Sequence, residues 1–181
     1  MLLENANDLF FGEPAALHLW SFRLGQSLTQ TGLDPRGNVK SYSDLNTPEL
    51  AVAHEIDGTG LTWVRNPVNG GYSIPLLDKG ESRRFFPDFL VWKDKKIIAI
   101  DPKGGFLLQT EAGRKLLAIR DEKGQQRILV RFITDGTWSA ETMKQTSSSG
   151  FSVWRMTTTG QIRCTTHADV ASAVKKALET K

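Results

Sequence analysis

The chain contains almost no cysteine, because Cys164 is the only one among its 181 residues. A disulfide within the chain is therefore excluded, and so is a zinc site built from several cysteines. The three histidines, His18, His54 and His167, do not have the spacing of metal ligands. These absences favour a reducing, cytoplasmic setting.

Long apolar runs are also missing. No segment approaches the roughly 20 apolar residues that cross a bilayer, and the start of the chain, MLLENAND, has no basic leader ahead of an apolar stretch. The sequence has no G-x-x-x-x-G-K-[ST] phosphate-binding loop. We therefore expect a protein that neither crosses a membrane nor is exported, and that carries no ATPase of its own.

The charge is only mildly one-sided, with a net charge of +3 and a pI of about 9.1. This balance is compatible with a polyanionic partner such as nucleic acid, but it is also common among ordinary soluble proteins. A hydrophobic content of 39% in 181 residues is enough for one core. We expect a single domain.

The order of the expected elements indicates an α/β fold. Helices are predicted over 14–31, 47–56, 110–120 and 168–179, and Thr47 is predicted to cap the second one. Strands are predicted over 61–66, 72–77, 86–92, 97–101, 127–134, 151–156 and 161–166, with a loop over 144–150. The first two strands are expected to form a hairpin, and so are the third and fourth. This order is typical of a mixed sheet flanked by helices.

Two aspartates stand at the outer ends of the second hairpin, FFPDFLVWKDKKIIAIDPKGG. A turn centred between Asp94 and Lys95 would make Asp88 and Asp101 cross-strand partners, with their Cβ atoms about 5 Å apart. Because like charges in an apolar setting repel, a cation is expected between them. Lys103 would project to the same face, and Mg²⁺ suits two converging carboxylates. The same residues have simpler interpretations: Asp101-Pro102-Lys103-Gly104 is also typical of a type I turn, and Asp88 can simply open a strand.

The two acidic units resemble a known signature. Pro87-Asp88 followed by Asp101-Pro102-Lys103 is similar to the PD-(D/E)XK motif of nucleases. The flanking segments ELAVAHEID, WVRNP, GYSIP, FFPDFLVW and IDPKG resemble, in order and spacing, the C-terminal endonuclease region of type III restriction enzyme restriction subunits and related helicase-nucleases. The resemblance covers about residues 49–120.

The resemblance implies a restriction-endonuclease-like mixed sheet, with an N-terminal helical extension over 1–46, a core over 47–136 and C-terminal strands and a helix over 137–181. It implies a Mg²⁺-dependent DNA endonuclease, with Mn²⁺ as a substitute, that belongs to a restriction or defence system. A helicase/ATPase and a modification subunit would be its partners in that system.

The resemblance also assigns roles to residues. Asp88, Asp101 and Glu49 would bind the metal, and Lys103 would orient the attacking water. Glu49 is preferred to Glu55, which lies on another helical face. An acid in a first helical turn is also favourable as a simple cap, and Pro102 departs from the family pattern.

Several basic residues are candidates for the nucleic-acid backbone. The candidates are Arg65, Arg83, Arg84, Arg114 and Lys115, of which Arg65 and Lys115 are preferred. Each is also compatible with an ordinary solvated surface charge. Two other functions stay open: a catalytically silent nuclease fold used for DNA binding or complex assembly, and a nuclease that acts on RNA.

Overall fold

The computed structural model describes residues 45–67, 71–78, 81–102, 105–119 and 127–180. These residues belong to one compact unit, Ser43–Lys181. The helix predicted over 14–31 lies outside the described residues, and so does Lys103.

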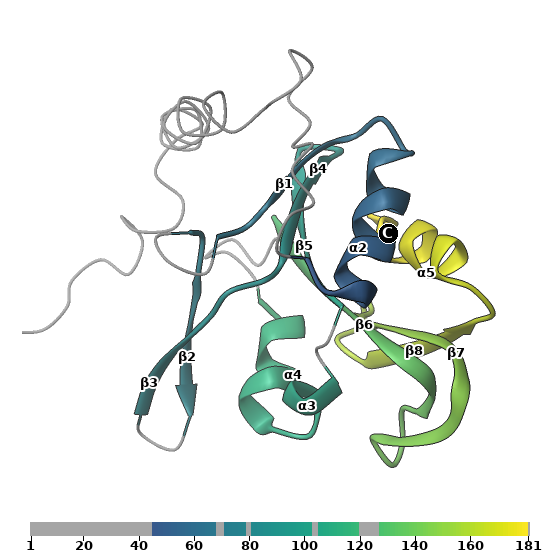
Figure 1. Cartoon of the computed structure of the whole chain (residues 1–181). Helices are drawn as coiled ribbons and strands as arrows, with labels where there is room; N and C mark the ends of the chain where they lie inside the picture. The colour runs from purple at the N-terminus through teal and green to yellow at the C-terminus, as the bar shows by residue number, and fades with distance from the viewer. Residues whose placement is uncertain (1–44, 68–70, 79–80, 103–104, 120–126, 181) are drawn as a thin grey trace, which may run out of the picture. The chain divides into compact units, whose positions relative to one another are not determined.

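A mixed six-stranded sheet forms the centre of this unit (Figure 1). Its strand order is β1-β4-β5-β6-β7-β8, in which β5 and β6 run parallel and every other neighbouring pair is antiparallel. A separate two-stranded sheet joins β2 and β3. The strands are β1 (Thr62–Arg65), β2 (Ile74–Asp78), β3 (Glu81–Phe85), β4 (Phe89–Lys93), β5 (Lys96–Asp101), β6 (Ile128–Ser139), β7 (Lys144–Met156) and β8 (Ile162–His167). The predicted α/β class with a mixed sheet flanked by helices is confirmed.

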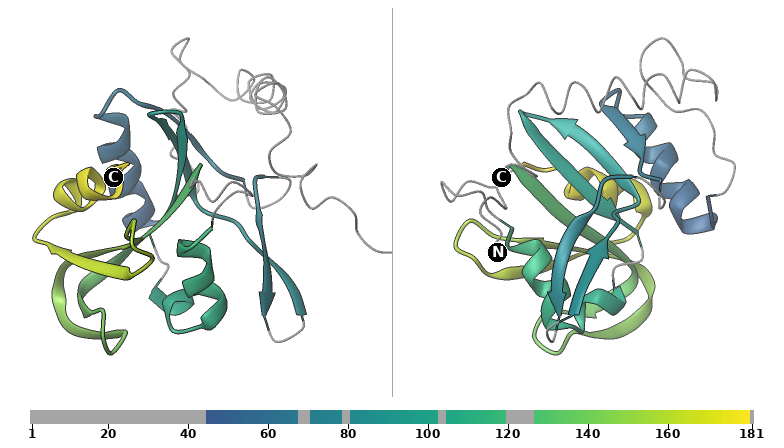
Figure 2. Two further views of the ribbon diagram at one scale, coloured as in Figure 1. Left: turned by 180° about the vertical axis from the view of Figure 1, so that it is seen from behind. Right: turned by 90° about the vertical axis from the view of Figure 1, so that its left-hand side faces the viewer.

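Short helices cover the sheet on both sides (Figures 1 and 2). On one side α2 (Thr47–Asp57) and α5 (Val170–Ala177) contact each other, and on the other side lie α3 (Gly105–Leu108) and α4 (Glu111–Leu117). Because α3 and α4 connect β5 to its parallel neighbour β6, they supply the crossover that a parallel pair needs. No helix in the described ranges is long and apolar enough to cross a membrane.

The core is built from residues that alternate between the two faces of the central strands. Trp63, Phe89, Phe132 and Trp154 are its largest fully buried side chains. The rings of Trp63 and Phe89 meet edge to face with centroids 5.8 Å apart, as do those of Phe85 and Phe132. Burial of each such side chain stabilises the fold by about 1.5–3 kcal/mol before entropy is counted. Strand β4, which follows Asp88, and strand β5, which ends at Asp101, are therefore fixed by the core.

The N-cap of helix α2 lies one residue earlier than the sequence predicts. Its N-cap is Asn46, not Thr47, and Pro48 lies in the first turn. The Asn46 side-chain oxygen accepts from the Glu49 backbone N–H at 3.1 Å, and the Glu49 carboxylate accepts from the Asn46 backbone N–H at 3.4 Å. This reciprocal capping box satisfies two donors, whereas a Thr47 hydroxyl would satisfy one.

The predicted hairpin between strands 61–66 and 72–77 is wrong. β1 instead pairs with β4, with Trp63 opposite Val91, and β2 pairs with β3, with Ile74 opposite Phe85. Pairing with β4 buries Trp63 in the main core, which a local hairpin could not do. β3 has the sequence ESRRF and lacks an apolar alternation, so the sequence pattern misses it.

The segment 144–150 is not the predicted loop. It forms the first half of β7, which runs from Lys144 to Met156 and pairs with a β6 that continues to Ser139. Its side chains are small and polar and nearly all are exposed, so the period-2 burial signal of a strand is absent. Backbone pairing, together with hydrogen bonds from the side chains of Thr137, Gln145 and Thr146, maintains this part of the ribbon.

Candidate active site

The β4–β5 hairpin closes at the predicted position. Asp94 and Lys95 have φ values of 50° and 59°, which identifies a two-residue turn of the type that suits the right-handed twist of a hairpin. Lys93 pairs with Lys96, and the ladder ends with Phe89 opposite Ile100. The register inferred from the sequence is therefore confirmed over the whole length of β4.

Asp101 is the last residue of β5 and is half-buried. It pairs with Phe132 of β6, which pairs with Trp154 of β7, which in turn pairs with Cys164 of β8. Directly paired residues project to the same face of a sheet. Asp101 therefore belongs to a row of four residues across one face, at the carboxyl end of β5.

Asp88 lies one residue before β4, so the strand predicted over 86–92 starts too early. Pro87 has no N–H to give to a sheet ladder, which explains the later start. The Asp88 carbonyl oxygen instead accepts from the Asn66 backbone N–H at 2.8 Å. If the hairpin register continues one step beyond Phe89 and Ile100, Asp88 is the position opposite Asp101, and it is also half-buried.

A buried asparagine holds the backbone around Asp88. Asn66 is only 3% exposed, and its amide nitrogen donates to the carbonyl oxygens of Tyr72 and Pro87 at 2.7 and 2.8 Å. Its side-chain oxygen accepts from the Tyr72 backbone N–H at 2.7 Å. Asn66 therefore ties the end of β1 and the approach to β2 to the residue before Asp88. No local sequence pattern points to Asn66.

Glu49 occupies the capping role described for α2 and is 6% exposed. The start of α2 lies near the end of β5, because Thr47, Pro48 and Pro102 line one apolar cavity of about 250 Å³. Ile133 lines the same cavity, and it projects to the face opposite Phe132. Glu49 and Asp101 therefore approach the end of the sheet from different faces.

Two of the three predicted carboxylates, Asp88 and Asp101, suit a hard cation. Mg²⁺ takes oxygen ligands and is usually held by one or two carboxylates plus waters, so Asp88 and Asp101 fit that donor set. In the part of the chain that the structure describes, no group of three or more His, Cys, Asp or Glu side chains is placed to hold a metal ion. The metal-binding roles of Asp88, Asp101 and Glu49 stay predictions, as does the role of Lys103.

The basic residues predicted to meet nucleic acid are spread over several elements. Arg65 is half-buried at the end of β1, opposite Phe89. Lys115 is exposed on α4 and forms an ion pair of 2.8 Å with Glu111, which lowers the pKa of that carboxyl. Arg114 donates to the Leu108 carbonyl at 3.5 Å, and Arg84 donates to Ser73 Oγ at 3.2 Å. These basic residues come from three elements, β1, β3 and α4.

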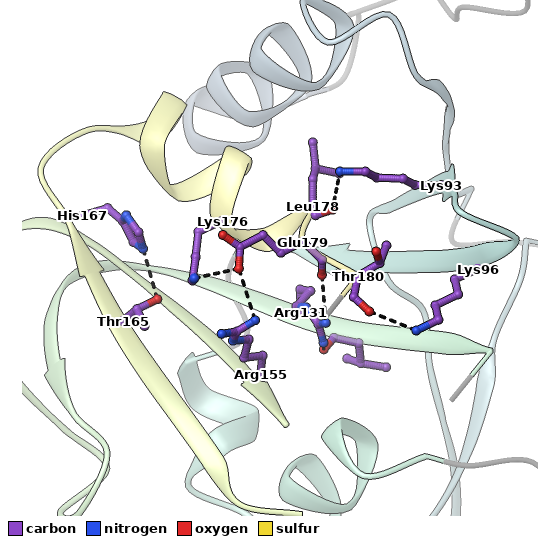
Figure 3. A network of polar contacts seen from close by, with 11 residues as sticks. Lys93, Lys96, Arg131, Arg155, Thr165, His167, Lys176, Leu178, Glu179 and Thr180 are labelled. Carbon is purple, nitrogen blue, oxygen red and sulfur yellow. Dashed lines mark hydrogen bonds and ion pairs between the residues drawn. The ribbon is translucent and has the colours of Figure 1, made fainter. Parts of the chain in front are cut away.

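One polar cluster was not anticipated from the sequence (Figure 3). Arg131, in the middle of the apolar strand β6, is 2% exposed and donates to the Glu179 carbonyl oxygen at 3.3 Å. Burial, followed by the nearby charge of Arg155, lowers the pKa of Arg131 to about 10. A charged residue inside RILVRFIT is the signal that could have marked it.

Comparisons of the whole chain with protein-family models, with curated proteins and with solved structures gave no match. The assignment of a function to this chain therefore depends on its own residues and their geometry.

Proposed function

We propose that this protein is a Mg²⁺-dependent endonuclease that hydrolyses DNA phosphodiester bonds, built on a restriction-endonuclease-like sheet. The observation that carries the proposal is the register of the β4–β5 hairpin, which ends with Phe89 opposite Ile100. Continued by one residue on each side, this register would make Asp88 and Asp101 neighbours. An acid and an acid-x-lysine unit on adjacent strands are the parts that the PD-(D/E)XK signature requires.

The chemistry gives each residue a task. A Mg²⁺ ion held here would polarise a phosphoryl oxygen and lower the pKa of bound water. Asp88 and Asp101 would hold and orient that ion from one face of the hairpin. Lys103 would add a compact positive charge beside the phosphate. Pro102, which is buried, follows the last residue of β5 and has no N–H to continue its pairing.

The direct test compares two isosteric changes at opposite ends of one hairpin. Asp101→Asn should abolish Mg²⁺-dependent nicking or cutting of plasmid DNA, by at least a hundredfold. Asp94→Asn should cut like the parent, because Asp94 is exposed in the turn and an amide oxygen can still accept from Thr180 Oγ1. Undiminished cutting by Asp101→Asn would reject the assignment.

One observation favours a second function, a nuclease fold without catalysis that binds DNA or assembles with partners. The described residues hold no group of three His, Cys, Asp or Glu side chains placed to bind a metal ion. Isothermal titration with Mn²⁺ separates the two proposals. The nuclease should give a heat of Mn²⁺ binding that disappears in Asp88→Asn. A silent domain should give no heat that depends on Asp88.

If the chain acts as type III restriction nucleases do, it works beside a helicase/ATPase and a modification subunit. The described residues supply neither activity by any motif, so DNA translocation and site recognition would come from such partners. Co-purification of the full chain with the products of neighbouring genes checks this part of the proposal.

A further inference from the structure

The ribbon formed by β6 and β7 extends beyond its neighbours. β5 pairs with β6 only as far as Phe132, and β8 pairs with β7 only from Phe151 onward. Residues 137–150, which we call the arm, therefore pair only with each other within the described sheet. The arm leaves the sheet at the end of β5 that carries Asp101.

The arm bends over one face of the sheet. Gly136 and Gly150 have φ values of 79° and 78°, and the β6–β7 register shifts around Thr137. The fully buried Ser152 donates to the Gly136 carbonyl at 2.8 Å and accepts from the Trp138 backbone N–H at 3.1 Å. These bonds fix the base of the arm in one conformation.

The bend brings the arm onto the face of Asp101. The ring of Trp138 packs edge to face on Trp154 with centroids 6.2 Å apart, and Cys164 Sγ donates to the Trp138 carbonyl at 3.5 Å. Trp154 and Cys164 belong to the same cross-strand row as Asp101. Trp154 is two strands from Asp101, a separation of about 10 Å. The arm therefore lies on the same face of the sheet as Asp101, two strands away from it.

The exposed surface of the arm is polar and carries no net charge. Its exposed residues are Glu141, Thr142, Lys144, Gln145, Thr146, Ser147, Ser148 and Ser149. Hydroxyl and amide groups donate and accept hydrogen bonds, whereas the core of a protein–protein interface is enriched in aromatic residues and Met. A two-stranded ribbon fits the major groove of B-DNA, which is about 12 Å wide. Duplex DNA matches the shape and the chemistry of the arm better than a protein surface does.

We propose that the arm enters the major groove of duplex DNA and holds the duplex against the Asp101 site. The proposal rests on the proposed nuclease function for its substrate. It adds a contact surface 137–150, outside the segment that resembles the nuclease family. Because one lysine and one acid cancel, the arm contributes hydrogen bonds to base edges and little phosphate neutralisation.

Site-specific photo-cross-linking tests the contact without requiring cleavage. In the full chain with Cys164→Ser, a cysteine is introduced by Ser148→Cys in the arm or by Thr158→Cys in the β7–β8 turn, and each is labelled with an aryl azide. Both positions are exposed, and they lie at opposite ends of β7. With a duplex of about 20 base pairs in EDTA, Ser148→Cys should cross-link at least tenfold more than Thr158→Cys.

The groove assignment makes a further distinction. The major groove of A-form RNA is too deep and narrow for side chains to read, so cross-linking to a matched RNA duplex or to single-stranded DNA should fall at least fivefold. Equal yields from the two cysteines, or no DNA cross-link at all, would overturn the arm as the contact. If RNA duplexes and single-stranded DNA cross-link as much as duplex DNA does, the assignment to the major groove is wrong.

A matched affinity measurement completes the test. The double change Gln145→Ala with Ser148→Ala should weaken duplex binding about tenfold in fluorescence anisotropy, with the slope of log K against log salt unchanged. The control, Gln161→Ala with Thr158→Ala, should bind like the parent. If the arm cross-links to DNA but the protein never cuts DNA, the proposed nuclease function is rejected and the arm contact is kept. Cutting by a protein whose arm does not cross-link would reject the arm alone.

Discussion

At the scale of single residues, the fold depends on one neutral amide more than on its charged groups. Asn66 makes three side-chain hydrogen bonds of 2.7–2.8 Å in a buried position. Each joins backbone outside the strands, either at Tyr72 before β2 or at Pro87 before Asp88. A buried polar side chain with its bonds satisfied stabilises one conformation, and loss of one partner leaves the others with the full cost of desolvation.

We expect Asn66→Ala to lower the free energy of unfolding by about 3 kcal/mol, since it leaves three backbone groups without their side-chain partner. Asn66→Asp keeps the acceptor for the Tyr72 N–H but has no donor for the Pro87 and Tyr72 carbonyls, so it should also destabilise at pH 7. Urea denaturation followed by tryptophan fluorescence measures both. A loss below about 1 kcal/mol in Asn66→Ala would contradict this role.

Local residue patterns could predict some of this site and not the rest. The turn at Asp94-Lys95, and with it the hairpin register, follows from short-range spacing and is confirmed. The role of Asn66 depends on Pro87, which is 21 residues away, and no local pattern contains that contact. The N-cap was misplaced by one residue because Asn46 and Thr47 are both good caps.

At the scale of elements, the β6–β7 ribbon is shaped by glycines. Gly150 has φ +78°, and a Cβ there would lie 2.7 Å from the His167 carbonyl oxygen. Gly160, in the β7–β8 turn, has a similar φ of +82° and no atom within 4 Å of such a Cβ. The two positions separate the cost of the left-handed backbone from the cost of crowding.

Gly160→Ala should therefore destabilise by about 1 kcal/mol, the cost of placing a Cβ in the left-handed region. Gly150→Ala should cost about 2–3 kcal/mol, because β8 must also move away from the new methyl group. Paired urea titrations measure the difference. Equal losses in the two variants would mean that the crowding at Gly150 relaxes freely.

Strand prediction failed where the side chains give no alternation. β3 (ESRRF) and the first half of β7 (KQTSSSG) are polar, and only backbone pairing identifies them as strands. β1 was correctly expected as a strand but was given the wrong partner. Sequence neighbours often pair, and here the burial of Trp63 against Phe89 favours β4 instead.

At the scale of the whole described unit, residues 178–180 connect α5 to three strands (Figure 3). Lys93, Arg131 and Lys96 donate to the carbonyl oxygens of Leu178, Glu179 and Thr180 at 3.0, 3.3 and 3.0 Å. Cations are favoured at the C-terminal end of a helix, where carbonyl groups lack helical partners. The Glu179 carboxylate also pairs with Lys176 at 2.7 Å and with Arg155 at 3.3 Å. It is thus the counter-charge of a cluster rich in cations.

This cluster predicts a pH-dependent stability. The hydrogen bond from Lys176, with the charges of Lys176 and Arg155, holds the pKa of Glu179 below its usual value of 4.5. A lowered carboxylate pKa stabilises the fold above the unfolded pKa, and that contribution is lost as the pH falls through the folded pKa.

Because the side chain is 45% exposed, Glu179→Gln should cost no more than about 1 kcal/mol at pH 7. The difference in stability between Glu179→Gln and the parent should shrink below about pH 4.5, and it should also shrink in 1 M salt. The control is Glu141→Gln, at an exposed position in the arm, which should match the parent under all of these conditions. Urea midpoints measured between pH 3 and pH 7 give this difference directly. If Glu179→Gln loses as much stability at pH 3 as at pH 7, Glu179 contributes packing and not charge.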